Sequence, residues 1–394
     1  MISKPFNDIS ETDVLALQMA GVQEGKTIEY KRDIPGTRDE DKREFLADMS
    51  SFANTEGGDI LFGVDEYQGV IKDILGVALP DFDAEMLRLD NLIRDGIDPR
   101  ITLFFRALTC TNKKLLLVRV EKSWNGPHRV VFRGHDKFYA RTSAGKFPLD
   151  VTQLKTAFLH SATLTEEISG FRLDRIVDIA NNRGPITLEK GPRLALHIIP
   201  LGALSGQIQI DMGTLSDNLN GHQSWNASSW NGKITFDGFL LNRASPRNGS
   251  ITSAYSHFYR NGILEAVTTS LLEGGRNADG MNRLIPHQSL EKNTVEYLTR
   301  CFEALESLNV SPPFSVSLSL IGVTGLRMAR SFYDLDAGNE IREQNLIIPG
   351  AIVQSFSFSP TQLLRPMFDR IWNACGFHKS ENFDLEGNWA PAHN

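Results

Sequence analysis

Apolar and polar residues alternate with a period of two over residues 28–31, with Ile28 and Tyr30 on one side and Glu29 and Lys31 on the other. This alternation predicts a β-strand with one buried face. Further along, apolar residues recur at spacings of three and four, which predicts an amphipathic helix with a charged outer side. Its apolar residues are Phe45, Met49, Phe52 and Ala53, and its solvent-facing residues are Asp41, Lys42 and Glu44.

A glycine pair ends this helical pattern and leads into a second strand. Asn54 and the pair at residues 57–58 are expected to stop the helix, because glycine supplies the positive φ of a helix C-terminus and a tight turn. We attribute the two glycines to backbone geometry and not to phosphate binding. Residues 59–64 then form a short apolar run bounded by turn signals, which is typical of a buried central strand.

The order strand, helix, strand delivers four carboxylates, Glu24, Glu29, Asp65 and Glu66, to the ends of neighbouring strands. Taken singly, Glu24, Asp65 and Glu66 are more simply solvent-exposed or capping residues of turns. As a set, they would repel by several kcal/mol at about 4 Å unless a cation or protons relieve the charge. Oxygen ligands without imidazole or thiolate favour Mg²⁺ or Mn²⁺, which can activate water at a phosphate. Lys31 either adds a fixed positive charge there or simply pairs with Glu29.

The second half of the chain indicates a separate domain without a catalytic motif. A helix is predicted over residues 164–180, followed by a helix-breaking segment at 181–185. Further predicted elements are strands at 194–199, 234–241 and 315–321 and a helix at 294–308. We expect an α+β protein made of a mixed α/β domain at 1–163, a helical linker at 164–185, and an α+β sensor or regulatory domain at 186–394.

A polar loop at residues 221–232 carries two large aromatic side chains, Trp225 and Trp230. Paired tryptophans can form a recognition surface, although covering the edge of a core is their commoner use. Both interpretations stay open from the sequence.

Composition limits the classes of protein to which the chain can belong. With 394 residues, of which 41% are hydrophobic and 23% charged, the chain can form two domains with proper cores. The cysteines, Cys110, Cys301 and Cys375, are odd in number and lack Cys-x-x-Cys spacing, which argues against a disulfide framework and a thiolate zinc site. The first residues lack an apolar signal core, and no run approaches about 18 apolar residues. We expect an intracellular, cytoplasmic protein.

Charge is unevenly distributed along the chain, whose net charge is −7. Residues 1–99 hold 10 Lys and Arg against 22 Asp and Glu, whereas residues 100–160 hold 12 against 3. Basic residues neutralise phosphates, and the interleaved aromatic residues offer faces to unstacked bases. The alternative is that many of these charges are solvated strand faces and that Lys113 and Lys114 only form a hairpin turn. The expected RNA-binding residues are Lys113, Lys114, Arg129, Arg133, Lys137, Tyr139, Arg141 and Lys146.

Several motifs in this order resemble one known family. They are Glu-x4-Glu-x-Lys at Glu24, Glu29 and Lys31, Phe-Ala-Asn-Thr-x-Gly-Gly at 52–58, Gly-Val-Asp-Glu at 63–66 and Phe-Tyr-Ala-Arg-Thr-Ser at 138–143. The combination resembles the Schlafen-type Alba-like domain and covers about residues 15–160.

The resemblance implies a divalent-metal-dependent endoribonuclease that cleaves structured RNA, above all tRNA. Glu24 and Glu29 match two of the three acidic catalytic residues. The third falls in the pair Asp65 and Glu66, where the family more often has two aspartates, and Glu66 matches by its position in the motif. The metal ligands are therefore expected to be Glu24, Glu29 and Glu66, with Mg²⁺ or Mn²⁺ as cofactor. Lys31 completes the expected catalytic group.

The same resemblance has consequences for assembly and biology. Animal members carry two such lobes, which form a saddle around RNA, whereas one lobe is visible here. A homodimer would rebuild the groove. The Cys/His zinc site of those members has no counterpart here. A nuclease coupled to a C-terminal sensor for a phage or host trigger implies a role in bacterial antiphage or stress defence.

Other catalytic classes lack their motifs in this chain. There is no Gly-x4-Gly-Lys-Ser/Thr phosphate loop, no His-Glu-x-x-His and no Gly-x-Ser-x-Gly elbow. Two alternatives to the nuclease stay open. One is a nucleic-acid-binding regulator of DNA or RNA without cleavage, and the other is an ATP-binding protein without a P-loop.

Overall fold

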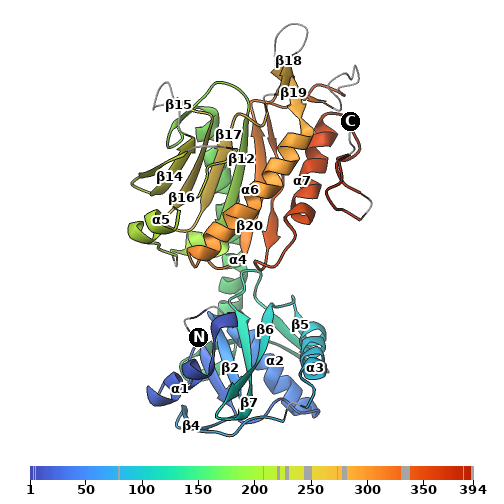
Figure 1. The fold of residues 1–394 in the computed structure, drawn as a ribbon. Helices are drawn as coiled ribbons and strands as arrows, with labels where there is room; N and C mark the ends of the chain where they lie inside the picture. The colour runs from blue at the N-terminus through green and yellow to red at the C-terminus, as the bar shows by residue number, and fades with distance from the viewer. Residues whose placement is uncertain are drawn as a thin grey trace. The chain divides into compact units, whose positions relative to one another are not determined.

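The computed structural model divides into two compact units, residues 1–163 (unit 1) and 164–394 (unit 2), which are described separately (Figure 1). It describes all residues except 3, 5, 79, 207, 220–221, 227–229, 244–250, 273, 277–281, 330–337, 385 and 392–394. The predicted α+β class is confirmed, since both units combine helices with sheets. Within the described residues, no helix is both long and apolar enough to span a membrane.

Unit 1 is built on a four-stranded sheet whose order is β1–β2–β7–β6. β1 and β2 are parallel, and the other neighbours are antiparallel. The predicted strand at 28–31 is confirmed as β1, with Ile28 and Tyr30 buried. All residues of β2 are buried, as expected for a central strand. The strands are β1 (Ile28–Lys31), β2 (Gly57–Phe62), β6 (Leu103–Cys110) and β7 (Lys113–Glu121).

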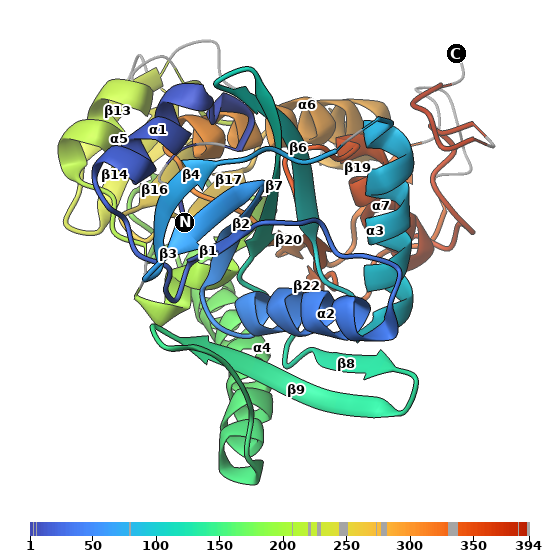
Figure 2. The same ribbon diagram turned by 90° about the horizontal axis from the view of Figure 1, so that it is seen from below.

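A second sheet of order β10–β9–β8–β5 lies across helix α2 (Asp39–Ala53) from the first sheet (Figure 2). Because α2 contacts both sheets, every residue from Phe45 to Ala53 is buried. Asn54 caps the helix, as predicted, and its side chain also bonds the backbone of His128 and Tyr139. The strands of this sheet are β5 (Ile97–Asp98), β8 (Arg129–Phe132), β9 (His135–Thr142) and β10 (Gly145–Pro148).

Smaller elements complete unit 1. A hairpin of β3 (Val64–Tyr67) and β4 (Val70–Ile74) follows β2, with an irregular register between Asp65 and Glu66. Helix α1 starts after a capping box at Ser10 and Asp13. The remaining elements are η1 (Phe6–Asp8), α1 (Glu11–Met19) and α3 (Phe82–Gly96).

A buried ion pair ties the first residues of the chain to the sheet. Asp59 on β2 is fully buried, and Arg119 on β7 donates to both of its carboxylate oxygens, at 2.7 and 2.9 Å. The same guanidinium donates to the carbonyls of Ile2 and Lys4. Arg119 belongs to the basic stretch of the sequence, but burial gives it a structural role.

Helix α4 (Val151–Ala180) crosses the boundary between the units as one continuous element. The sequence pattern predicted only its second half, from residue 164. The first half leaves Val151, Phe158 and Leu159 exposed, so it lacks the buried stripe that helical periodicity detects. The helix residues from Leu164 onward belong to unit 2 instead of forming a separate linker.

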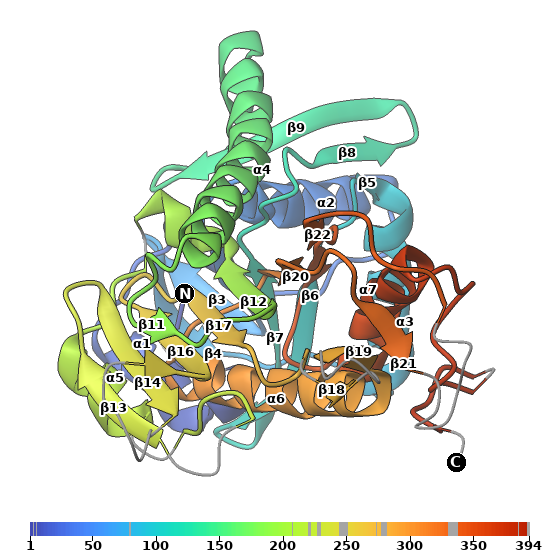
Figure 3. The same cartoon turned by 90° about the horizontal axis from the view of Figure 1, so that it is seen from above.

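Unit 2 is centred on an antiparallel eight-stranded sheet of order β13–β14–β16–β17–β12–β20–β22, with β23 also paired to β20. Helices α6 and α4 cover its opposite faces (Figure 3). The strands are β12 (Arg193–Pro200), β13 (Trp230–Ile234), β14 (Gly238–Arg243), β16 (Ala254–Tyr259), β17 (Leu264–Thr268), β20 (Phe314–Ile321), β22 (Asn345–Ile347) and β23 (Ala351–Val353).

The other elements of unit 2 lie around this sheet. The helices are α5 (Met212–Leu219), α6 (His287–Ser307), α7 (Pro360–Ala374) and η2 (Leu201–Ser205). The short strands are β11 (Thr187–Leu188), β15 (Ile251–Thr252), β18 (Gly274–Arg276), β19 (Asn282–Pro286) and β21 (Arg327–Ala329).

A buried charge network joins α4 to its face of the sheet. Glu265 on β17 is fully buried, and Arg175 of α4 donates to both of its carboxylate oxygens, at 2.7 and 3.0 Å. Tyr255 donates a third hydrogen bond at 2.7 Å, and His197 contacts the carboxylate at 3.2 Å. Burial opposes ionisation of Glu265, but the bonds from His197 and Arg175 outweigh it and lower its pKa to about 2.

The predicted elements of unit 2 are mostly present with shifted bounds. The strands at 194–199 and 315–321 are confirmed as β12 and β20, and the helix at 294–308 is the end of α6. The single strand predicted at 234–241 is wrong. It is the hairpin of β13 and β14, because the chain turns at Phe236 and Asp237 in mid-run.

The interpretation of the two tryptophans as a recognition surface is wrong for Trp225. This side chain is fully buried and stacks on Tyr297, with ring centroids 5.1 Å apart, so it belongs to the core. Trp230 begins β13, and residues 221 and 227–229 of the predicted loop lie outside the described residues.

Candidate functional site

Strand β1 places Glu29 and Lys31 on the same side of the sheet edge, as its alternation predicted. The Glu29 carboxylate lies 2.9 Å from Lys31 Nζ and also pairs with the guanidinium of Arg141 on β9. Arg141 is buried and lies over the ring of Phe52, with its Cζ 3.7 Å from the centroid. Both oxygens of Glu29 therefore already have a cationic partner.

Helix α2 and strand β10 extend this arrangement. Lys146 Nζ lies 2.7 Å from Asp48 and 2.9 Å from Glu44. Lys31 lies 3.9 Å from Asp48 and 3.7 Å from Glu44, so each of these carboxylates pairs with both lysines. We call the resulting group the charge cluster. Its three carboxylates and three cations are Glu29, Glu44 and Asp48, and Lys31, Arg141 and Lys146.

The protonation states within the charge cluster follow from burial and pairing. Burial opposes ionisation of Glu29, but Lys31 and Arg141 outweigh it and lower its pKa. Burial also disfavours the Lys31 ammonium, yet Asp48 and Glu29 raise its pKa, so this side chain stays charged at neutral pH. For the deeply buried Asp48, desolvation prevails and its pKa is raised despite Lys146 and Lys31.

Glu24 and Glu66 meet beside this cluster at the turn between β3 and β4. The backbone N–H of Glu24 donates to the carbonyl of Gly69 at 2.7 Å, and the N–H of Gly69 donates to the Glu66 carboxylate at 2.7 Å. The Glu24 carboxylate accepts a bond from the N–H of Tyr30 at 2.6 Å. Burial raises the pKa of Glu24, and the negative charges of Glu29 and Glu66 raise it further.

Asp65 points to a different partner. Its carboxylate lies 3.7 Å from Lys72 on β4. The negative charge of Glu66, by contrast, raises the pKa of Glu24. This geometry favours Glu66 over Asp65 as the third member of an acidic group.

In this conformation, the side chains of the three proposed metal ligands do not form a metal-binding group. Within the described part of the chain, no three His, Cys, Asp or Glu side chains are close enough to hold a metal ion. Glu29 is occupied by Lys31 and Arg141, and Glu24 and Glu66 each give one oxygen to a backbone N–H. A divalent ion at these residues stays a prediction from the family resemblance.

The basic residues predicted to bind RNA separate into several groups. Lys113 and Lys114 are exposed at the start of β7, after a two-residue turn at Thr111 and Asn112, both of which have positive φ. The predicted hairpin is therefore present, but Thr111 and Asn112 form its turn, and Lys113 and Lys114 begin β7. Lys113 also donates to the carbonyl of Ile74 at 2.6 Å.

The remaining predicted contacts lie on the second sheet. Arg129 pairs with Asp136 at 3.1 Å and with Asp98 at 3.4 Å. Arg133, in the turn before β9, pairs with Asp39. Tyr139 bonds His135 through its hydroxyl at 2.7 Å. Lys137 is exposed and, among the described residues, has no ion-pair partner.

Two predicted RNA contacts belong to the charge cluster. Arg141 is 3% exposed, so a phosphate cannot reach its guanidinium while Glu29 and Phe52 enclose it. Lys146 is partly exposed, at 22% of its side chain, and already pairs with two carboxylates. An RNA phosphate must therefore compete for Lys146, and Arg141 acts by positioning Glu29.

Backbone geometry requires a glycine at Gly57, as predicted, whereas Gly58 is required by the space that its neighbours leave. Gly57 has φ +72, and a Cβ there would lie 2.7 Å from the backbone of β7. A Cβ on Gly58 would clash with the ring of Phe52, which is the ring that Arg141 covers. Larger residues at Gly58 would therefore displace the floor of the charge cluster.

Asp48 was missed from the sequence, and Glu44 was treated only as a solvent-facing residue. Asp48 follows Phe45 by three positions and precedes Phe52 by four, so it lies on the apolar face of α2. A carboxylate on an apolar helix face indicates a buried partner, because an unpaired buried charge is costly. That signal was readable, although the partner on β10 was not.

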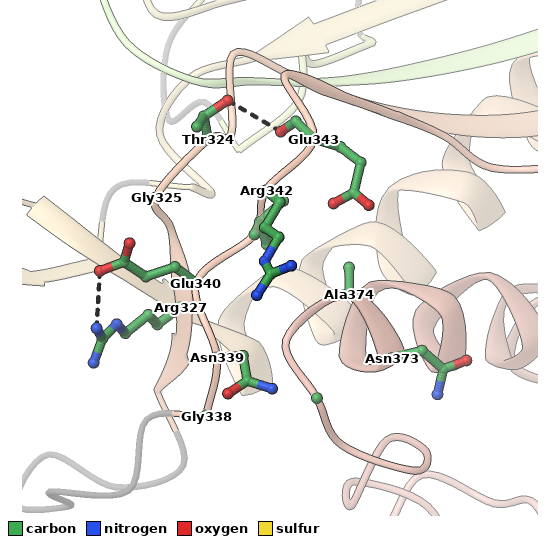
Figure 4. A pocket seen from close by; sticks show the side chains of 12 residues that line it. Thr324, Gly325, Arg327, Gly338, Asn339, Glu340, Arg342, Glu343, Asn373 and Ala374 are labelled. Carbon is green, nitrogen blue, oxygen red and sulfur yellow. Dashed lines mark hydrogen bonds and ion pairs between the residues drawn. The ribbon is translucent and has the colours of Figure 1, made fainter.

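A broad hollow in unit 2 has a polar lining (Figure 4). Its volume is about 960 Å³, and the Arg342 guanidinium points into it. Arg327 pairs with Glu340 at 2.8 Å, and the Thr324 hydroxyl donates to the carbonyl of Glu343 at 3.1 Å. Acidic and basic side chains balance there, so the hollow indicates no particular class of ligand.

Among the comparisons with known proteins, the match to a family model bears on unit 1. No curated protein matches the chain. One similar solved structure is the DIP2311 protein from Corynebacterium diphtheriae, at 17% identity over 35% of this chain and 27% of that chain, with a TM-score of 0.25. Another is the N-terminal domain of a putative ATP-dependent DNA helicase RecG-related protein from Nitrosomonas europaea. It matches at 23% identity over 32% of this chain and 82% of that chain, with a TM-score of 0.26. A family model described as Schlafen, AlbA_2 matches residues 24–150, and the chain therefore carries a Schlafen AlbA_2 domain.

Proposed function

We propose that unit 1 binds structured RNA, above all tRNA, and cleaves its phosphodiester backbone. The observation that carries this proposal is the charge cluster, which holds lysine ammonium groups beside Glu24 and Glu66. The Schlafen AlbA_2 domain supports a nucleic-acid partner. Fixed cations suit the phosphate backbone, whose neutralisation supplies much of the affinity in nucleic-acid binding.

In this proposal, a phosphate enters the charge cluster by replacing Glu44. The Glu44 side chain is 59% exposed, whereas those of Glu29 and Asp48 are 15% and 4% exposed. Displacing Glu44 from the lysines therefore costs less free energy than displacing Glu29 or Asp48. Its departure frees Lys31 and Lys146 to contact the phosphate, while Asp48 keeps both lysines in place.

Glu24 is the candidate for proton transfer. Its raised pKa brings the carboxyl group closer to neutral pH, where a group can both accept and release a proton. Lys31 remains charged and can stabilise negative charge that develops on the scissile phosphate. Glu29 holds Lys31 and Arg141 in place through its two oxygens.

The finer expectations from the family resemblance belong to the same proposal. They are Mg²⁺ or Mn²⁺ as cofactor, a homodimer that completes the RNA groove, a trigger at unit 2, and a role in antiphage or stress defence. A bound divalent ion would supply charge neutralisation at the phosphate.

Incubating the purified chain with total tRNA or duplex DNA, in Mg²⁺, Mn²⁺ or EDTA, tests the proposal on a denaturing gel. We expect discrete tRNA fragments in the presence of a divalent ion, and intact DNA. Glu24→Gln and Glu29→Gln should each slow cleavage by about 100-fold or more, the size expected for lost transition-state electrostatics. Glu56→Gln, which alters an exposed ion pair with Lys26, serves as the control.

The outcomes separate cleavage from other activities. Fragments that persist at equal rates in both variants would place the activity elsewhere and reject this site. Intact tRNA in every lane, with a retarded band on a native gel, would support RNA binding without cleavage. That second candidate is favoured by one observation, namely that both oxygens of Glu29 are engaged by cations.

Removing the charge of Glu44 should strengthen RNA binding. Glu44→Gln removes the exposed carboxylate that competes with phosphate for Lys31 and Lys146, so we expect a dissociation constant lower by about two- to fivefold at low salt, the size of an exposed ion pair. The gain should shrink as salt rises. Fluorescence polarisation with labelled tRNA measures it. Glu40→Gln removes another exposed charge from α2, and an equal gain there would show a net-charge effect only.

A further inference from the structure

A small cavity of about 350 Å³ lies in unit 2 where α5, the segment after it and α6 meet. It is distinct from the hollow of Figure 4 and from the sites of unit 1. Its volume falls within the usual range of small-molecule sites. The lining residues that matter here are Asn218, His222, Gln223, Arg300, Glu303 and Ser307.

Two side chains that line this cavity carry buried polar atoms without a hydrogen-bond partner in the described structure. They are His222 Nε2 and Arg300 Nε. In the same segment as His222, Ser224 Oγ and Trp225 Nε1 are also buried and unpartnered. Each such atom costs about 1–3 kcal/mol when left unsatisfied, so a group of them is unusual in a finished core.

The positions of these side chains are fixed by their surroundings. The His222 ring packs edge-on against Phe258, with centroids 5.3 Å apart, and Trp225 stacks on Tyr297. Arg300 lies over the ring of Tyr297, with its Cζ 5.4 Å from the centroid. One Arg300 nitrogen, Nη1, donates to Gln223 at 3.2 Å, which leaves Nε and Nη2 of the fork.

The charged side chains that line the cavity are Arg300 and Glu303. Burial and the nearby guanidinium lower the pKa of His222 to about 4, so its ring is neutral near pH 7 and carries one N–H. Glu303 lines the rim and is exposed to solvent. A ligand entering the cavity therefore meets a guanidinium with free N–H groups and a neutral imidazole.

We propose that this cavity binds a small molecule through an oxyanion, a carboxylate or a phosphate, received by the Nε and Nη2 groups of Arg300 and by His222. A guanidinium fork pairs with planar or tetrahedral oxyanions through parallel hydrogen bonds. The ligand would supply the partners that the buried atoms lack. This inference concerns unit 2 and stands or falls independently of RNA cleavage by unit 1.

Titrating the 394-residue chain with sodium phosphate and, separately, with sodium acetate tests this site against sodium chloride at matched ionic strength. Isothermal calorimetry measures binding, and tryptophan fluorescence follows Trp225, which stacks on Tyr297, the ring that Arg300 covers. We expect saturable binding of at least one oxyanion. The phosphate and acetate arms decide which of the two the site prefers.

Substitutions test whether the oxyanion binds in this cavity. Arg300→Gln should raise the dissociation constant at least about tenfold, and His222→Gln should raise it less. Arg300→Lys keeps the charge without the fork and should fall between wild type and Arg300→Gln, which separates binding from any folding defect. Lys292→Gln, an exposed position on the same helix, should bind as wild type does. No saturable binding of either oxyanion, or equal binding by Arg300→Gln, would overturn the proposal.

Discussion

Replacing Arg119 by methionine is expected to destabilise unit 1 by about 3–5 kcal/mol, the cost of removing one partner from a buried ion pair. The change leaves Asp59, which is fully buried, without its counter-charge. It also removes the donors to the carbonyls of Ile2 and Lys4, so the first residues lose their attachment to the sheet. Urea unfolding followed by circular dichroism measures the change.

Two comparisons make this result specific. The double variant Asp59→Asn/Arg119→Met should recover part of the lost stability, because neither charge is then left alone in the core. Lys26→Ala breaks an exposed ion pair with Glu56 and should cost less than about 1 kcal/mol. If Arg119→Met and Lys26→Ala lowered stability equally, burial would not be the source of the effect.

Replacing Glu265 by glutamine should destabilise unit 2 by a similar amount, about 3–5 kcal/mol. Arg175, which is largely buried, would keep only its ion pair with Asp178, and Tyr255 and His197 would lose a charged acceptor. Since Arg175 belongs to α4, the change should loosen the attachment of this helix to the sheet. Glu340→Gln, which alters an exposed pair with Arg327, is the matched control and should have little effect.

The same carboxylate gives unit 2 a defined acid sensitivity. The pKa of Glu265 is lowered from its usual 4.5 to about 2, so its stabilisation is complete above 4.5 and is lost as pH falls through 2. The shift corresponds to about 3 kcal/mol over that window. Glu265→Gln should flatten the stability profile between these pH values. A variant whose profile keeps the wild-type slope would assign the acid sensitivity to other groups.

The sequence pattern predicted the local elements of unit 1 because they depend on neighbouring residues. The alternation at β1 and the glycine pair before β2 both follow from short-range rules. The same rules placed Glu29 and Lys31 on one side of a strand, which the structure confirms. The family motifs then indicated the domain, because they occur together and in order.

The charge cluster could not be predicted because it depends on long-range pairing. Asp48 and Lys146 are far apart in sequence, and only the packing of α2 against β10 brings them together. A count of basic residues also treats Arg141 and Lys137 alike, although one is buried and the other is exposed. Composition therefore overestimated the number of side chains free to contact RNA.

In unit 2, the predictions from the sequence pattern failed for other reasons. The run at 234–241 satisfied strand criteria throughout, and only the turn at Phe236 and Asp237 divides it into a hairpin. The first half of α4 exposes its apolar residues, so it lacks the periodic burial on which helix prediction depends.

The three cysteines give each unit a built-in chemical probe. Cys110 lies in unit 1 and Cys301 and Cys375 lie in unit 2, and all three are buried and reduced. A thiol reagent can reach them only when the surrounding structure opens, so the labelling rate of each cysteine reports the opening of its own unit. Mass spectrometry of labelled peptides would thus show whether a substitution or an added ligand acts on one unit or is transmitted to the other, without any engineered label.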